Sequence, residues 1–451
     1  MKGRKEGRKM KKKVIAIGLL SIMVISLCAC GSDKKSSESS SESSSEEKTK
    51  VTFQTWNPGE GEATERVIAA FEEKNPDIDI EFTCIPYSDH MQKLKVDLMS
   101  GGGPDVFGMQ TGASLKEFRD FEMELGSYAE EQYGQDWSSD YKEFAMDLLN
   151  EDGEYYALPL GVSYAGFMWA DMKYMDKYNL TIPQNYEELV ETAKFLRDKG
   201  EYPVAIGAKD DWINIDTWMS IANDINSEKL YSAIEGETSF EDADLVESFR
   251  IWQKCFTDGV FQDGALGVNV FSDVSDLFEK EGSIPMYMNG GWTINCYLRP
   301  DPDMQEIFNA EGAEHEGFLM DWNNDGKVCP VTAAADVVLC MNKNTKNEEA
   351  AWKWIDFLLH EGQEILINDY LNYFPSRTSM ELNVDNLSDD GKKNLAYIEE
   401  QSVNNVGGYR EMPYPELKQS IADNLQTLAL ESVTPEEAAK IVEEASQKQE
   451  R

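Results

Sequence analysis

One short segment of the chain has the residue spacing of a calcium-binding loop. Asp321, Asn323 and Asp325 alternate with other residues, as the ligands do at the start of such a loop. The twelfth position should then be a glutamate that binds calcium with both oxygens, but it is Thr332. The segment therefore favours a hairpin turn at 324–326 over a calcium site. We predict no bound metal and no cofactor.

Catalytic motifs are absent from the sequence. None of the three histidines, His90, His315 and His360, lies in an HExxH pattern, and there is no GxSxG, Walker A or GxGxxG pattern. Acidic pairs that resemble those of glycosidases are unavoidable in a chain with 84 acidic residues, so they are uninformative. We predict that the protein is not an enzyme.

The first 29 residues have the pattern of an export signal. A basic run over 2–13 precedes an apolar segment over 14–29, which is short for a membrane span. A small residue stands directly before Cys30, a pattern that resembles the lipobox of bacterial lipoproteins, where the signal is cleaved before a cysteine that is then lipidated. Cys28 is a poorer candidate, because the bulky Leu27 would lie at the cleavage site. An uncleaved N-terminal anchor is the alternative.

Residues 30–50 fit a tether that follows the lipidated cysteine. After Cys30 the segment contains no aromatic and no aliphatic side chain before Val51, and it consists mainly of Ser, Glu, Lys and Asp. Such a segment cannot bury enough apolar surface to offset its loss of entropy on ordering, so we expect it to be disordered. The predicted location is the outer face of the cell membrane, in a Gram-positive cell, and a lipoprotein that faces the periplasm is the alternative.

Composition and length exclude several functions. A formal net charge of −42 argues against binding to nucleic acid and against direct docking on anionic lipid. The cysteines after the tether are scattered without CxxC spacing, which favours neither a disulfide scaffold nor a zinc site. The roughly 400 residues after the tether are too many for one ordinary core, so two lobes are expected.

The folded part begins with alternating strands and helices. Apolar patterning and turn residues predict a β-α-β-α-β run over 51–56, 62–74, 78–85, 91–99 and 104–107. This order implies a parallel sheet covered by helices, with ligand-binding residues at the carboxyl ends of its strands. At the other end of the chain, Thr434 and Glu437 form a capping box that predicts a helix over 436–445.

Ten segments in a fixed order resemble a known family. They are Trp56, Phe71–Ile80, Ser100–Phe107, Gly153–Pro159, Phe167–Tyr174, Pro183–Leu189, Phe278–Trp292, Asn342–Leu358, Phe374–Arg377 and Thr434–Ala438. Together they are similar to the extracellular solute-binding proteins of sugar ABC importers, over essentially the whole mature chain. The sequence departs from that pattern at Ala170, where the family usually has Asn, and at Asn185, where Thr is common.

The resemblance implies an α/β, two-lobed periplasmic-binding-protein-like fold of the type II style, with the ligand cleft between lobes joined by a hinge. The chain would cross between lobes near 158–160, 333–336 and 373–375. The implied domains are the signal peptide (1–29), the tether (30–50), lobe 1 (51–159 with 333–372) and lobe 2 (160–332 with 373–451).

The implied function is that of a monomeric carbohydrate receptor, which delivers a sugar or oligosaccharide to the permease subunits of an ABC importer by hinge closure. The same fold binding a polyol, glycerol phosphate or peptide is an alternative, and a lipoprotein glycosidase is another. The acidity of the chain disfavours an anionic ligand, although a local arginine would reverse that preference.

Trp292 is the first candidate for contact with a sugar. Asn289, Gly290 and Gly291 force a tight turn after an expected strand over 284–288, which would project the indole into the cleft. Aromatic faces bury the C–H face of a sugar, while amides and carboxylates bind its hydroxyls. By resemblance this position stacks on sugar. A Trp packed into the lobe core is the alternative.

The other candidates are loop residues near strand ends, and each also has a structural explanation. Trp56 either lines the cleft or ends a core strand, Glu60 and Glu62 are either ligands or solvated surface, and Tyr164 either binds ligand or packs in the core. The remaining candidates are Gln110, Thr111, Ser163, Asp211, Trp212, Asn214, Trp218, Tyr373 and Tyr414.

Overall fold

The computed structural model describes residues 48–56, 62–279, 282–297, 314–371, 373–384 and 387–451. The predicted signal peptide, Cys30, most of the tether and Glu60 lie outside these residues, as does the side chain of Glu62. Within the described part of the chain, no helix has the length and apolar character that crossing a bilayer requires.

A five-stranded sheet contains the predicted N-terminal run. Its order is β2-β1-β3-β13-β6, built from β1 (Thr49–Thr55), β2 (Ile78–Cys84), β3 (Val106–Met109), β6 (Ala157–Pro159) and β13 (Val338–Met341). β1 pairs in parallel with β2 and β3, so the predicted β-α-β-α-β run is confirmed. Two later strands extend this parallel part, and β13 runs antiparallel to both β3 and β6.

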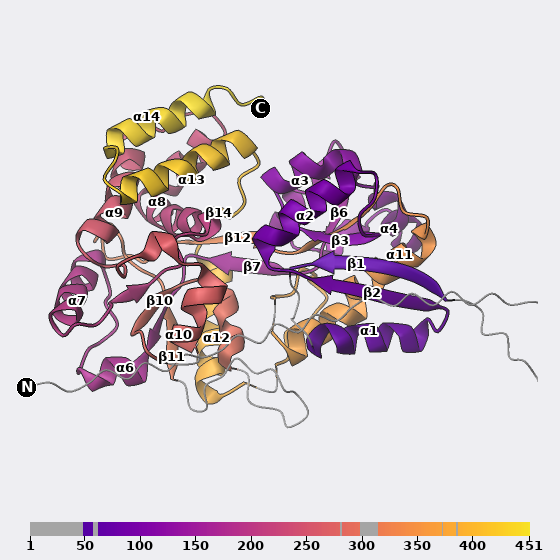
Figure 1. The fold of residues 1–451 in the computed structure, drawn as a ribbon, viewed down its shortest axis with the longest axis horizontal. Helices are drawn as coiled ribbons and strands as arrows, with labels where there is room; N and C mark the ends of the chain where they lie inside the picture. The colour runs from indigo at the N-terminus through magenta and orange to yellow at the C-terminus, as the bar shows by residue number, and fades with distance from the viewer. Residues whose placement is uncertain (1–47, 57–61, 280–281, 298–313, 372, 385–386) are drawn as a thin grey trace, which may run out of the picture. The chain divides into compact units, whose positions relative to one another are not determined.

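Helices cover both faces of this sheet (Figure 1). The connections from β1 to β2 and from β2 to β3 run in opposite directions across the sheet, so right-handed crossovers place α1 (Glu62–Lys74) and α2 (Tyr87–Met99) on opposite faces. α1 buries Val67 and Phe71, and the Phe71 ring lies 5.0 Å from that of Trp354 on α11 (Glu348–Phe357). The shorter helices here are α3 (Ala113–Phe118), α4 (Gly126–Tyr133) and α5 (Glu143–Asp147).

Two further sheets follow along the chain. The four-stranded sheet has the order β11-β8-β10-β9, with β8 (Met168–Asp171), β9 (Val204–Ala205), β10 (Met286–Met288) and β11 (His315–Phe318). The three-stranded sheet has the order β14-β12-β7, with β7 (Val162–Ala165), β12 (Val331–Ala335) and β14 (Val406–Tyr409). A small hairpin joins β4 (Asn150–Glu151) and β5 (Glu154–Tyr155).

The remaining helices are α6 (Met172–Lys177), α7 (Tyr186–Asp198), α8 (Asp211–Ile234), α9 (Ala243–Thr257), α10 (Ser275–Glu279), α12 (Asp389–Asn404), α13 (Pro415–Ala429) and α14 (Pro435–Ser446). The predicted capping box is confirmed at α14, where the Thr434 and Glu437 side chains each bond to the other residue's backbone N–H.

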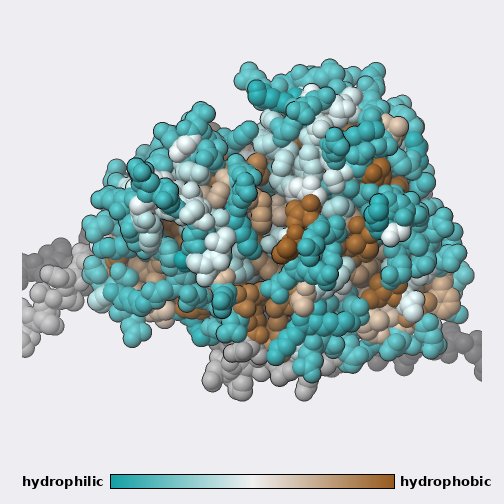
Figure 2. Space-filling model, turned by 180° about the vertical axis from the view of Figure 1, so that it is seen from behind, coloured by the Kyte–Doolittle hydropathy of each residue, from teal (hydrophilic) through white to brown (hydrophobic). Residues whose placement is uncertain are grey.

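The surface seen in Figure 2 is mostly hydrophilic, with hydrophobic residues gathered toward the middle of that face.

The chain passes between these sheets several times. It leaves the five-stranded sheet after Pro159 to form β7, and it returns between Ala335 and Val338. A later passage runs from α11 to α12, whose Asn394 donates to the His315 carbonyl of β11 at 3.0 Å.

β11 and β12 belong to different sheets, so the hairpin predicted around 324–326 is wrong. That loop is instead closed by a backbone bond from Cys329 to Met320 at 2.7 Å.

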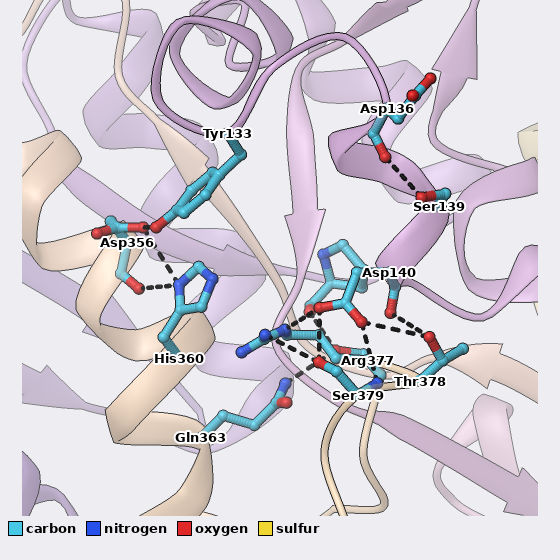
Figure 3. Close-up of polar contacts among 12 residues, drawn as sticks. Tyr133, Asp136, Ser139, Asp140, Asp356, His360, Gln363, Arg377, Thr378 and Ser379 are labelled. Carbon is cyan, nitrogen blue, oxygen red and sulfur yellow. Dashed lines mark hydrogen bonds and ion pairs between the residues drawn. The ribbon is translucent and has the colours of Figure 1, made fainter.

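A polar clamp holds the start of this later passage (Figure 3). Arg377 donates from Nε to Asp140 Oδ2 at 2.7 Å, and the Ser379 hydroxyl donates to the same oxygen at 2.7 Å. The backbone N–H of Thr378 donates to the Asp140 carbonyl at 2.5 Å. Asp140 therefore binds three successive residues of the passage through side chain and backbone.

We predict that Asp140→Asn lowers the free energy of unfolding by about 1 kcal/mol at pH 7, because Arg377 loses its charged partner in a half-exposed setting. Burial tends to raise the pKa of Asp140, but the bonds from Ser379 and Arg377 bring it below its ordinary value. The stabilisation is therefore complete above about pH 4 and is lost as the pH falls through the lowered pKa.

Urea unfolding of both proteins at pH 7 and near pH 3 measures this difference, which should shrink at the lower pH. Asp136→Asn is the matched control, because Asp136 is exposed in the same turn and only its backbone carbonyl accepts a bond, from Ser139. If both variants lose the same free energy of unfolding at pH 7, the stabilising role assigned to Asp140 in the clamp is refuted.

Candidate functional site

A buried arginine lies where several of these elements meet. Arg410 directly follows β14, and its side chain is 5% exposed. Its Nε and Nη2 donate to the carboxylate of Asp216 on α8, at 3.0 and 2.8 Å, and its Nη1 donates to Ser163 Oγ on β7 at 3.2 Å. A planar guanidinium fits a carboxylate in this two-point geometry, which fixes the direction of the side chain.

Two more carboxylates and a second cation complete the charged group. Asp336, between β12 and β13, has its Oδ1 3.8 Å from Arg410 Nη1 and accepts a bond from Gln110 Nε2 at 2.9 Å. Glu411 lies 4.0 Å from the guanidinium and accepts a bond from Lys418 Nζ of α13 at 2.6 Å. Three carboxylates therefore share two cations.

The neighbouring charges shift the pKa values in this group. Burial alone would lower the pKa of Arg410, but Asp216, Glu411 and Asp336 raise it above its ordinary value. Burial would raise the pKa of Glu411, but Lys418 and Arg410 bring it below its ordinary value. Arg410 therefore stays charged, as does Glu411 at neutral pH.

Aromatic rings lie against this group. The guanidinium carbon of Arg410 is 4.7 Å from the centre of the Trp292 ring, within the range of a cation–π contact. The Trp212 ring, at the start of α8, lies 5.9 Å from Trp292 and stacks on Phe271 at 5.8 Å. Trp212 and Trp292 are partly exposed and Phe271 is exposed, so we call these three rings the aromatic wall.

A hydrogen bond and close contact with a glycine fix the orientation of the Trp292 ring. Its Nε1 donates to Asn289 Oδ1 at 2.9 Å, and Asn289 Nδ2 donates to the hydroxyl of Tyr287 at 3.0 Å. The ring lies so close to Gly290 that a Cβ there would be 2.1 Å from a ring carbon. A side chain at 290 would displace the indole, so the predicted Asn-Gly-Gly turn has a steric role.

Two buried polar groups beside Asp336 have no hydrogen-bond partner among the described residues. They are Gln110 Oε1, on a side chain that is 8% exposed, and the hydroxyl of Tyr373, which is 2% exposed. Burial, with the negative charge of Asp336, raises the pKa of Tyr373 well above its usual value, so its hydroxyl stays protonated. An unpaired buried polar group costs about 1–3 kcal/mol, which a ligand would relieve.

The structure gathers six of the predicted residues around this centre. Gln110 and Ser163 bond to its charged groups, Tyr373 is buried near Asp336, and Thr111 donates to the Ala335 carbonyl at 3.4 Å. Trp212 and Trp292 form most of the aromatic wall.

Other predicted residues are held elsewhere. Trp218 is fully buried and stacks on Phe249 at 5.0 Å, and Asn214 is buried and donates to the Ala208 carbonyl at 2.9 Å. Tyr164 points to the opposite face of β7 from Ser163, because side chains alternate along a strand, and its ring packs against Phe374.

The last three predicted residues have partners other than Arg410. The Trp56 ring lies 5.1 Å from that of Tyr87, and Asp211 accepts a bond from Gln426 at 3.1 Å. Burial raises the pKa of Tyr87, which the charges of Lys418, Glu411 and Arg410 also shift. The Tyr414 hydroxyl donates to Glu235 at 2.6 Å.

Sequence reasoning missed the charged residues at the centre. Asp216 gave a usable signal, since it is the one charged residue in the segment Ile213–Ile221 and lies one helical turn after Trp212. A carboxylate in such a position requires a buried partner. Phe271 lies in the short helix Val270–Val274 and had no comparable signal.

A family model described as bacterial extracellular solute-binding protein matches residues 55–365. The chain belongs to this family. Among curated relatives of this solute-binding protein, the multiple sugar-binding protein of Streptococcus mutans is 23% identical over 77% of this chain and 78% of its own. The galactooligosaccharide-binding protein of Bacillus subtilis is 24% identical over 64% of this chain and 65% of its own.

Solved structures share its fold. A protein from a study of xylan utilisation by Caldanaerobius polysaccharolyticus superposes with a TM-score of 0.73 at 19% identity, covering 88% of this chain and 99% of that one. A chitin oligosaccharide binding protein gives 0.72 at 17% identity, with 89% and 98% coverage. The family and the α/β fold class predicted from the sequence are therefore confirmed.

We predict that Arg410→Met lowers the free energy of unfolding by about 3–5 kcal/mol, because it leaves three buried or partly buried carboxylates without their central cation. Arg250→Met is the matched control, since Arg250 pairs with Glu247 and Glu436 at the surface and should cost less than about 1 kcal/mol. Urea unfolding measures both, and similar losses would contradict the role assigned to Arg410.

Proposed function

We propose that this solute-binding protein is a carbohydrate receptor that captures a sugar or oligosaccharide outside the cell and delivers it to an ABC importer. The observation that carries the proposal is the partly exposed aromatic wall beside Asp336 and the unpaired oxygen of Gln110. Aromatic faces suit the C–H face of a sugar, and acceptor oxygens suit its hydroxyls. The names of its relatives, which include sugar- and oligosaccharide-binding proteins, support the same class of ligand.

Hinge closure is the proposed mechanism. Lobe 1 would comprise 51–159 with 333–372, and lobe 2 would comprise 160–332 with 373–451. The charged group takes Gln110 from the first lobe, Asp216 from the second, and Asp336 from a connection between sheets. A ligand that pairs with groups from both lobes has a higher affinity for the closed form, and it therefore shifts the population toward closure.

The closed receptor would present both lobes, as a monomer, to the permease subunits. It would bind sugar without cleaving it, and its relatives carry the names of binding proteins. A glycosidase is the rival from another class, and recovery of intact sugar distinguishes the two.

We predict that Trp292→Ala abolishes the thermal shift that a bound oligosaccharide produces, because the stacking surface is lost. A hundredfold excess over the Kd stabilises the wild type by about 2.7 kcal/mol, which a thermal shift detects. The screen uses xylo-, chito-, malto- and galacto-oligosaccharides, with polyols and peptides as other classes, and the sugar is recovered and checked for cleavage.

Tyr202→Ala is the control, because Tyr202 is an exposed aromatic residue outside the aromatic wall. It should bind like the wild type. A shift only with peptides or polyols, or recovery of cleaved sugar, would overturn the proposed function.

We also propose that the mature chain is anchored to the outer face of the membrane through lipidated Cys30, with 31–50 as the tether. The extracellular family supports export, and the small residue before Cys30 supports lipidation at that position. The acidic surface keeps the folded part away from anionic lipid, which makes a covalent anchor the means of retention.

Cys30→Ala should move the protein from the membrane fraction to the medium, or leave it with an uncleaved signal, when it is expressed in a Gram-positive host. Cys28→Ala is the matched control and should remain membrane-bound and cleaved. Fractionation with labelling by a fatty-acid analogue measures both. Loss of the label in Cys28→Ala, with the label kept in Cys30→Ala, would show that Cys28 carries the lipid.

A further inference from the structure

We propose that the site accepts uncharged, hydroxyl-bearing ligands and discriminates against sugars that carry a carboxylate or a phosphate. The inference rests on the proposed function and specifies the charge of its substrate class. Its basis is the arrangement around Arg410, the local arginine that would otherwise favour an anion.

The cation at the centre is already neutralised. Two nitrogens of Arg410 bind Asp216, and the third lies 3.2 Å from Ser163 and 3.8 Å from Asp336. An anionic ligand that took over the bonds to Asp216 would leave that carboxylate buried without its partner. Such an unpaired buried charge is strongly unfavourable.

Among Arg410 and the carboxylates closest to it, the most exposed charge is negative. The Asp336 side chain is 15% exposed, against 5% for Arg410 and for Asp216. The Lys418 side chain is more exposed, at 22%, but its ammonium is bound to Glu411 at 2.6 Å. A second carboxylate or a phosphate would therefore meet like charge, which costs binding free energy in a site shielded from water.

One of the two unpaired groups requires a ligand that donates a hydrogen bond. Gln110 Oε1 only accepts, because it is a carbonyl oxygen, whereas the protonated hydroxyl of Tyr373 both donates and accepts. A sugar hydroxyl donates to an acceptor of this kind, whereas an ionised carboxylate or phosphate oxygen does not. Charge and hydrogen-bond polarity therefore favour the same class of ligand.

One exposed cation lies near the aromatic wall. Lys209 donates to Asn269 Oδ1 at 3.0 Å, close in sequence to Phe271. Its ammonium is exposed to solvent, where salt screens it, so we assign it no role in selecting charge.

The test compares ligands that differ only in charge, by calorimetric titration of the full-length protein. Short xylo-, chito-, malto- and galacto-oligosaccharides are each reduced to the alditol or oxidised to the aldonate, and short oligogalacturonides are compared with their methyl esters. In every pair that binds, we expect the neutral member to bind at least about tenfold more tightly.

An acidic member that binds as tightly as its neutral partner would overturn the inference while leaving the proposed function intact. If no member of any pair binds, the proposed function fails and this inference fails with it. The comparison uses the wild-type protein, so it does not depend on how any variant folds.

The variant Asp336→Asn tests whether Asp336 is the residue that discriminates between neutral and acidic ligands. It should reduce the ratio between neutral and acidic members by at least about threefold, because the like charge is removed. Glu416→Gln removes an exposed carboxylate from α13 and should leave the ratio unchanged. If Asp336→Asn folds and keeps the wild-type ratio, Asp336 does not select against anions.

Discussion

The burial of one guanidinium constrains much of this solute-binding protein. Arg410 and its partners come from the segment after β14, from α8, from β7 and from the β12–β13 connection. Taking these ions out of water costs several kcal/mol for each, and the cost is offset only when all partners are in place. The elements that carry these partners must therefore meet in one arrangement, and the indole of Trp292 packs against the buried charged group that they form.

Local signals in the sequence were enough to predict much of the fold. The predicted helix over 62–74 coincides with α1, and the capping box at Thr434 is present as predicted. Trp292 was selected from the turn before it and from the family resemblance, and Trp212 from its place in an expected loop before a helix. The two rings lie 5.9 Å apart. Each of these features depends on residues close together in the chain.

The rest depended on partners that are distant in sequence. Arg410 and Asp216 are 194 positions apart, so no local pattern indicates that they pair. Ser163 and Tyr164 are adjacent and were predicted together, yet strand alternation sends one to Arg410 and the other into the core. The antiparallel β13 was missed for the same reason, since it pairs with β3, a strand that lies some 230 residues earlier in the sequence.

The position of β13 has a consequence for how the protein is made. This strand lies between β3 and β6 in the five-stranded sheet, although it follows both by more than a hundred residues. The sheet therefore stays incomplete until residue 341 has been synthesised, because its fourth strand arrives late and from a distance. Until then β6 has no partner strand in this sheet, because β13 is the only strand of the sheet that it pairs with among the described residues.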